Sequence, residues 1–254
     1  MDVNSGVLSG LARKLKIDPE WLIGAGGASG SAWMVREMNT VLRVGSRLQI
    51  DVEAEAHRLA AQFLPVPRVL DRADFEGSAG LLLEWMPGQT AFEAARRDPA
   101  AALRIGIACG ALHDRIDLIP TPPFEHRVGP GGLGPQGLLH LDLHPKNVLV
   151  DEHGEVTAVL DWANAARGPR GLDRARTWSI LTLDPATREI RTHHWWQQLV
   201  AGWGDRGGFR RVRPTERAWA CEFMLNDLLR RFTPDQLQPV REALDLVRSS
   251  RNQR

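Results

Sequence analysis

The residues best suited to chemistry gather in one short segment of the chain. Residues 138–162 have the sequence LLHLDLHPKNVLVDEHGEVTAVLDW. Two apolar, β-branched runs, residues 148–150 and 156–160, flank the turn-forming sequence Asp-Glu-His-Gly. Runs of this kind on either side of such a turn predict a β-hairpin.

The predicted hairpin brings oxygen-bearing side chains to one place. Counting inward from the turn pairs Asn147 with a residue near Val159 or Leu160. Asn147 and Asp161 therefore emerge at the same open end. Carboxylate and amide oxygens without cysteine suit Mg²⁺, which takes one or two protein oxygens and completes its shell with water and phosphate. Asp142, five residues before Asn147, can face the same point from the preceding loop.

A different geometry would give these residues a different chemistry. In an extended segment, the two-residue period of a strand would place His140, Asp142 and His144 on one face as metal ligands of a hydrolase. Pro145, directly after His144, favours a loop instead, and no further histidine group offers an obvious remaining ligand. The metal-dependent hydrolase is therefore a remote alternative.

The spacing also matches the catalytic loop of kinases, H-x-D-x-x-x-x-N followed by a metal-binding Asp after a hairpin. In detail it resembles the aminoglycoside phosphotransferase and choline-kinase-like family of small-molecule kinases more closely than protein kinases. The resemblance implies a catalytic role for Asp142 and metal binding by Asn147 and Asp161. It also implies that His140 and Asp173 brace the loop through hydrogen bonds.

The resemblance covers residues 22–173, with the pieces in the family's order. The glycine-rich residues 26–30 look like a loop that covers phosphates, residues 41–44 like the family's third strand, and residues 83–88 like its hinge. In the hinge, backbone groups would bind the adenine edge. By this resemblance the cofactor-binding residues are Ser29, Gly30, Arg43, Glu53, Glu84 and Met86.

The acid that would pair with Arg43 stays open between two candidates. Ungapped counting back from the Pro-Val-Pro sequence favours Glu53. The apolar stripe through Leu59 and Phe63 favours Glu55. Most kinases have a lysine where this chain has Arg43, and the two are not equivalent at a phosphate. A nucleotide-binding pseudokinase or regulatory module without turnover is therefore the main alternative.

Two further positions depart from the pattern of kinases. Leu141 stands where the family commonly has glycine. The sequence Asp-Trp-Ala at residues 161–163 replaces the Asp-Phe-Gly of protein kinases, which argues against a mobile switch of the protein-kinase type.

The resemblance implies an α+β, bilobal, protein-kinase-like fold. Residues 1–87 would form a small nucleotide-binding lobe, an antiparallel sheet with one main helix. Residues 88–254 would form a larger, mostly helical lobe for catalysis and substrate binding. The implied cofactors are ATP, or another nucleoside triphosphate, and Mg²⁺. The implied reaction moves the γ-phosphate to a hydroxyl of a small molecule, with antibiotics such as aminoglycosides among the candidates.

Hydrophobic periodicity predicts the elements that must position these residues. In the small lobe it predicts helices at residues 11–22 and 52–64. It also predicts strands at residues 32–36, 40–44, 69–70 and 81–84. In the larger lobe it predicts a helix over residues 92–113, a loop over 120–137, and helices beyond 172 except for a break at 202–208.

The composition of the chain limits the kinds of partner that we expect for it. The 254 residues include 32 basic and 31 acidic side chains, a formal net charge of +1, which gives no general attraction for nucleic acid. No apolar run is long enough to cross a membrane, and the first residues lack a signal sequence. Cys109 and Cys221 are isolated, as in a reduced protein. We therefore expect a cytoplasmic monomer or weak dimer.

The sequence does not identify the hydroxyl compound that accepts the phosphate. Residues 168–254 hold 16 arginines, no lysine and ten acids, a surplus of six positive charges that disfavours a polycationic aminoglycoside. Other hydroxylated antibiotics, amino alcohols and sugars remain candidates. Local clusters could still form among six acids: Glu189, Asp205, Glu216, Glu222, Asp227 and Asp235.

Overall fold

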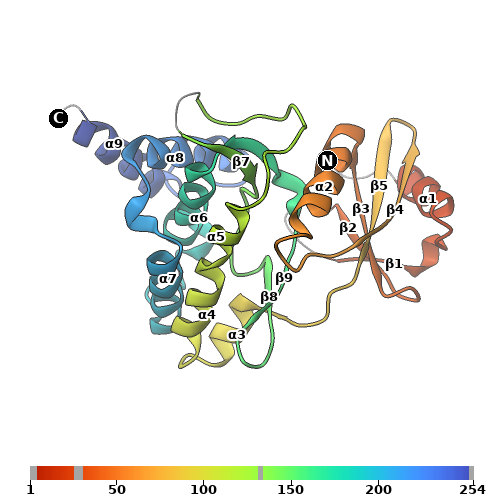
Figure 1. Cartoon of the computed structure of the whole chain (residues 1–254), viewed down its shortest axis with the longest axis horizontal. Coiled ribbons are helices and arrows are strands. Elements are labelled where there is room, and N and C mark those ends of the chain that lie inside the picture. The colour runs from red at the N-terminus through yellow and green to blue at the C-terminus, as the bar shows by residue number, and fades with distance from the viewer. Residues whose placement is uncertain (1–4, 26–30, 131–133, 252–254) are drawn as a thin grey trace. The chain divides into compact units, whose positions relative to one another are not determined.

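The computed structural model of the chain describes residues 5–25, 31–130 and 134–251. The chain divides into two units, Met1–Pro87 and Gly88–Arg254, referred to below as unit 1 and unit 2. Unit 1 combines an antiparallel sheet with helices, and unit 2 is mostly helical, so the fold class is α+β as predicted (Figure 1).

Unit 1 is built on a five-stranded antiparallel sheet with the strand order β1-β2-β3-β5-β4. The strands are β1 (Leu22–Gly24), β2 (Ala32–Val35), β3 (Thr40–Ser46), β4 (Val69–Phe75) and β5 (Ser78–Glu84). Strands β2 and β3 form an antiparallel hairpin, in which Ala32 of β2 pairs with Arg43 of β3.

Two helices pack on this sheet, α1 (Ser5–Lys14) on one face and α2 (Arg47–Ala60) on the other (Figure 1). Successive residues of a strand point to opposite faces. Leu82 of β5 accordingly joins Leu11 of α1 in one apolar cluster. Leu81 joins Ile50 of α2 in another. The sheet thus supports α2, which carries the candidate partners of Arg43.

The first helix lies earlier than predicted. The sequence pattern predicts a helix over residues 11–22, but α1 ends at Lys14, and Pro19–Trp21 forms a separate 3₁₀ turn, η1. Asp18 has the extended dihedral angles φ −69° and ψ 123°. A residue before proline is disfavoured in the helical region, which explains the interruption.

Helix α2 begins five residues before the predicted start at residue 52. Ser46 and Gln49 form a reciprocal capping box, in which the Gln49 amide donates to Ser46 Oγ at 3.3 Å and the Ser46 amide donates to Gln49 Oε1 at 3.2 Å. Such a cap satisfies backbone donors that have no partner inside the helix.

Unit 2 contains long helices and two small sheets, one of two strands and one of three. The helices are α3 (Ala91–Arg97), α4 (Ala102–Gly110), α5 (Leu112–Ile116), α6 (Gly171–Leu183), α7 (His194–Arg206), α8 (Pro214–Leu228) and α9 (Gln238–Arg251). The short 3₁₀ turns are η2 (Trp162–Asn164), η3 (Pro185–Thr187) and η4 (Phe209–Arg211). The strands are β6 (Gln89–Thr90), β7 (Gln136–Leu139), β8 (Val148–Val150), β9 (Val156–Val159) and β10 (Ala166–Pro169).

Two predictions about the helices of unit 2 are wrong. The single helix expected over residues 92–113 is three helices, interrupted first around Pro99. The break expected at residues 202–208 begins later, because α7 continues to Arg206. A side chain at Gly202 would collide with the backbone carbonyl of Leu103 in α4. This glycine therefore allows two helices to pack closely and does not interrupt α7.

The C-terminal helices share one apolar core. Met224 and Leu228 of α8 pack with Ile180 of α6 and with Val240 of α9. This packing fixes α6 and α8 against each other beside the segment with the predicted chemistry. In the part of the chain that the structure describes, no helix is long and apolar enough to span a membrane.

Candidate active site

The hairpin of β8 and β9 has the register that the sequence predicts. Val148 lies opposite Val159, and the Leu160 amide donates to the carbonyl oxygen of Asn147 at 2.8 Å. Asp161 directly follows Leu160. The strand pairing therefore brings Asn147 and Asp161 to the same end of the hairpin.

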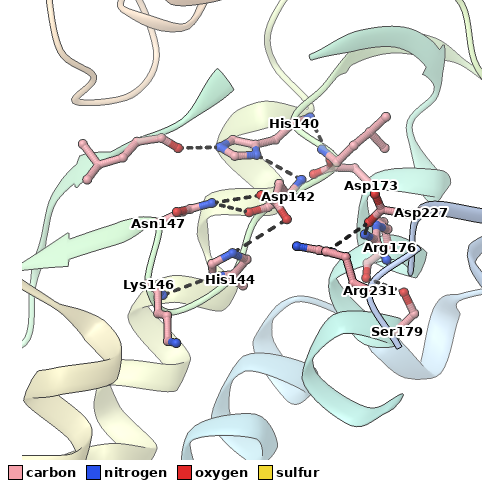
Figure 2. Close-up of polar contacts among 12 residues, drawn as sticks. His140, Asp142, His144, Lys146, Asn147, Asp173, Arg176, Ser179, Asp227 and Arg231 are labelled. Carbon is pink, nitrogen blue, oxygen red and sulfur yellow. Dashed lines mark hydrogen bonds and ion pairs between the residues drawn. The ribbon is translucent and has the colours of Figure 1, made fainter. Parts of the chain in front are cut away.

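Asp142 and Asn147 contact each other across the loop that enters β8. Asn147 Nδ2 donates to the Asp142 carbonyl oxygen at 2.9 Å and lies 3.4 Å from Asp142 Oδ2 (Figure 2). Because the amide nitrogen faces Asp142, the amide oxygen of Asn147 is the atom left to bind a cation. The Asp142 side chain is 26% exposed, which leaves its carboxylate accessible to a ligand.

His144 lies beside the carboxylate of Asp142. Its Nδ1 accepts a hydrogen bond from the Lys146 amide at 3.2 Å, so Nε2 carries the hydrogen and faces Asp142 Oδ1 at 3.7 Å. Burial lowers the pKa of His144, although the neighbouring carboxylates of Asp142 and Asp161 oppose this effect. The neutral imidazole can therefore orient the Asp142 carboxylate without adding a charge.

A buried carboxylate on α6 holds the loop that carries Asp142. Asp173 Oδ1 accepts hydrogen bonds from the amides of His140 and Leu141, both at 2.8 Å. Asp173 Oδ2 lies 3.4 Å from Nδ1 of His113. The His113 ring accepts at Nε2 from the Trp203 indole at 3.4 Å, and indole only donates, so Nδ1 is the protonated nitrogen.

The electrostatics of Asp173 favour its charged form. Burial raises the pKa of this carboxyl group, but hydrogen bonds from His113 and from the Leu141 amide outweigh burial and hold the pKa below its ordinary value. Asp173 is thus an ionised, buried anchor for the loop, in the bracing place that the resemblance assigns to it.

Two residues of the site have backbone angles that side chains rarely adopt. Leu141 has φ 62° and Asp161 has φ 59°. Leu141 is 2% exposed and packs with Leu139 and Leu172. The burial of Leu141 and the hydrogen bond from its amide to Asp173 hold its backbone at this strained φ. The glycine that the family usually has at this position would adopt the same φ without strain.

The hydrolase alternative fails on the geometry of His140. Its Nδ1 accepts from the Asp142 amide at 3.2 Å, and its Nε2 lies 2.9 Å from the Leu160 carbonyl oxygen. Both nitrogens are therefore used inside the loop. The ring also packs on Trp162, with 4.6 Å between ring centroids. Within the described ranges, no group of three or more His, Cys, Asp and Glu side chains is arranged to hold a metal ion.

The donor chemistry fits a hard cation bound together with phosphate. Asn147 supplies an amide oxygen and Asp161 a carboxylate, and neither sulfur nor imidazole lies among these donors. Mg²⁺ is usually held by one or two protein oxygens, with phosphate and water oxygens completing six positions. A site with few protein ligands is what such a cation requires.

In unit 1 the structure pairs Arg43 with Glu53. Arg43 Nε donates to Glu53 Oε1 at 3.1 Å, and both side chains are buried. Glu55 instead forms an ion pair with Arg58 at 2.6 Å on the surface of α2. Of the two acids left open by the sequence, Glu53 is therefore the partner of Arg43.

The structure describes two of the four remaining nucleotide-binding candidates. Ser29 and Gly30 lie outside the described residues. Glu84 ends β5, where its amide donates to the Arg68 carbonyl oxygen at 2.9 Å, so its backbone N–H is not available to a nucleotide. Met86 follows β5 and is half-buried.

Sequence reasoning missed Arg176, a buried arginine of α6 beside this site. Its Nη2 donates to Asp227 Oδ2 at 3.0 Å (Figure 2). Helical spacing provided a signal, because Arg176 follows Asp173 by three residues and so shares its face of the helix. The sequence analysis also gave no role to His113, whose partner Trp203 lies 90 residues away in the sequence.

The comparison with protein families decides the class of the chain. The model of the phosphotransferase enzyme family, APH, matches residues 21–133 and 126–215, well over half of the sequence. The chain belongs to this family. It is therefore a phosphotransferase, as the spacing of the catalytic loop and the resemblance predicted. Among curated protein sequences, none matches the chain.

Solved structures show that the fold is that of the family. An aminoglycoside-3'-phosphotransferase of type VIII superimposes with a TM-score of 0.62 at 19% sequence identity, over 94% of this chain and 98% of the other. APH(3'')-Id from Streptomyces rimosus, in complex with ADP and streptomycin, superimposes with a TM-score of 0.58 at 18% identity, over the same shares of the two chains. The protein-kinase-like fold is thus confirmed.

Proposed function

We propose that this phosphotransferase transfers the γ-phosphate of ATP, or of another nucleoside triphosphate, to a hydroxyl group of a small molecule in the presence of Mg²⁺. The observation that carries the proposal is the hairpin register, which places Asn147 and Asp161 at one end, with Asp142 in contact with Asn147. An amide and two acids in this arrangement are what phosphoryl transfer requires.

Asp142 is the proposed catalytic residue. Its partly exposed carboxylate would accept a hydrogen bond from the acceptor hydroxyl, orient the oxygen toward the γ-phosphorus and take up the proton. The acceptor oxygen forms the new bond to phosphorus while the bond to the leaving nucleoside diphosphate breaks. His144 and Asn147 would hold the carboxylate in this orientation.

Asn147 and Asp161 are the proposed metal ligands. When bound, Mg²⁺ neutralises charge on the phosphate oxygens. Most of the rate acceleration in phosphoryl transfer comes from positioning and electrostatic stabilisation, so the chain's main task is to keep these two ligands and Asp142 in fixed places. The hydrogen bonds of His140 and Asp173 serve that task.

Arg43 and Glu53 are the proposed phosphate-binding pair of unit 1. The carboxylate of Glu53 fixes the buried guanidinium through Nε. An arginine held in this way presents a planar group of donors to phosphate oxygens. For Glu84 we propose that the carbonyl group contacts the base, because its amide already donates to the Arg68 carbonyl oxygen, with Met86 supplying the second backbone contact.

A panel of hydroxyl compounds tests the proposal. Purified enzyme is mixed with ATP and Mg²⁺, and release of the nucleoside diphosphate is measured with each acceptor. Streptomycin belongs in the panel because a structural neighbour is known in complex with it. We expect acceptor-dependent release that is lost in Asp161→Asn. Nucleotide binding without release on any acceptor would instead support the regulatory alternative, which the replacement of the usual lysine by Arg43 suggests.

A further inference from the structure

Arg176 is a buried positive charge next to the proposed catalytic residue. Its side chain is 5% exposed, and its guanidinium carbon lies 5.0 Å from the centre of the Phe223 ring. One nitrogen, Nη2, is hydrogen-bonded to Asp227, whereas Nε and Nη1 are buried without a hydrogen-bond partner among the described residues. Such incomplete satisfaction of a buried cation is costly and calls for compensation by nearby charge.

The compensation comes from acids on several elements. Burial lowers the pKa of Arg176, and the carboxylates of Asp142, Asp227 and Asp184 oppose this effect. Asp184, at the start of η3, acts in the same way on Arg191. Asp227 and Asp184, two of the acids that face Arg176, therefore each lie near a second arginine, Arg231 and Arg191 respectively.

Asp227 is contacted by two arginines. Arg176 Nη2 lies 3.0 Å from Oδ2 of Asp227. Arg231 lies farther away, with its Nη2 3.9 Å from the same oxygen. Arg231 is also 46% exposed, whereas Arg176 is almost completely buried. Arg176 makes the closer contact with Asp227, and the guanidinium of Arg231 points toward Asp142, so Arg231 can bind another anion on that side (Figure 2).

We propose that Arg231 binds a negatively charged group of the acceptor, a carboxylate or a phosphate, and so determines acceptor specificity. This inference rests on the proposed function and narrows it to anionic hydroxyl compounds. Arg176 is a positioning residue in this scheme, because it neutralises Asp227 and leaves Arg231 available. The planar guanidinium of Arg231 suits both carboxylate and phosphate, each of which can accept two parallel hydrogen bonds.

The test compares acceptors that share hydroxyl groups but differ in charge. The panel contains glucosamine and streptomycin as cations, glucose and sorbitol as neutral compounds, glucuronate and gluconate as carboxylates, and glucose 6-phosphate as a phosphate. Nucleoside diphosphate release gives kcat and KM for each compound. We expect the highest kcat/KM with an anionic compound, and the carboxylate and phosphate arms show which anion is preferred.

Variants of Arg231 test its role directly. Arg231→Gln should raise KM for the preferred anionic acceptor roughly tenfold while kcat and the KM for ATP stay within about twofold, because a binding contact distant from the reacting atoms is lost. Arg231→Glu should shift the preference toward the cationic compounds. Arg230→Gln, which removes the exposed arginine next in sequence, is the matched control and should leave every constant unchanged.

The outcomes separate this inference from the proposed function. Turnover that is highest with a cationic or neutral acceptor would overturn the inference and leave the proposed function intact. Equal effects of Arg231→Gln on acceptors of every charge would also overturn it, since a merely structural role would act in that way. No release with any compound would overturn the proposed function and this inference together.

Discussion

Replacing Asp173 by asparagine tests how the catalytic loop is held. The carboxylate accepts two backbone hydrogen bonds at 2.8 Å, and hydrogen bonds to a charged group contribute about 1.5–3 kcal/mol each, compared with about 1 kcal/mol for neutral pairs. Asparagine keeps an acceptor for these amides but loses the charge. Its NH₂ group would also face the Nδ1 hydrogen of His113, which replaces the attractive 3.4 Å contact with the carboxylate by a contact between two buried donors, at a cost of about 1–3 kcal/mol.

Relief from burying a charge offsets part of this loss, so we expect Asp173→Asn to lower the free energy of unfolding by about 2–4 kcal/mol at pH 7. Urea unfolding followed by tryptophan fluorescence measures the change, since Trp203 and Trp162 are both buried near the site. Asp245→Asn, at an exposed position of α9, is the control. A cost no larger than that of the control would refute the proposed anchoring role.

The pH dependence of this difference gives a second check. Because the folded protein holds the pKa of Asp173 below its ordinary value, the stabilisation is complete above the unfolded pKa of about 3.9 and is lost as the pH falls through the folded value. The difference between the wild type and Asp173→Asn should therefore stay constant from pH 7 to about pH 5 and shrink below about pH 4. A difference that grows on acidification would contradict an ionised Asp173.

Three further changes have expected outcomes. Leu141→Gly relieves the strain of a positive φ, roughly 1–2 kcal/mol, but removes a buried side chain. Because the lost burial outweighs the strain, the free energy of unfolding, measured by urea titration, should fall by about 1–3 kcal/mol. A more stable variant would show that strain dominates. Gly202→Ala places a methyl group against the Leu103 carbonyl and should cost about 2 kcal/mol in thermal unfolding, whereas an unchanged melting temperature would mean that α4 and α7 separate easily. Glu53→Gln removes the charge that fixes Arg43, so KM for ATP should rise several-fold, and steady-state kinetics with unchanged constants would exclude the pair from nucleotide binding.

The fold was predictable where local signals were strong. The β8–β9 hairpin follows from two apolar runs around a turn, and its register places Asn147 as expected. The start of α2 was also available from the sequence, because Ser46 and Gln49 have the spacing of a capping box that the apolar pattern alone did not reveal. Gly202 was misplaced because a glycine needed for helix packing has the same sequence signal as a glycine in a turn.

In the candidate site, too, the residues that are close in sequence were predictable and the contacts between distant residues were not. Asp142, Asn147 and Asp161 lie within twenty residues of one another, so their spacing carried the prediction. The contact of Asp173 with His113 joins residues 60 positions apart, and the ion pair of Arg176 with Asp227 joins residues 51 positions apart. Contacts at such separations depend on how α6, α8 and α5 pack, and no local periodicity encodes them.

The most direct test of the central claim measures kcat and Mg·ATP affinity on the same preparations of wild type and Asp142→Asn. If Asp142 orients the acceptor and takes its proton, kcat should fall roughly 10²–10⁴-fold while the Kd for Mg·ATP, measured by calorimetry, stays unchanged. Unchanged turnover in Asp142→Asn would contradict the account.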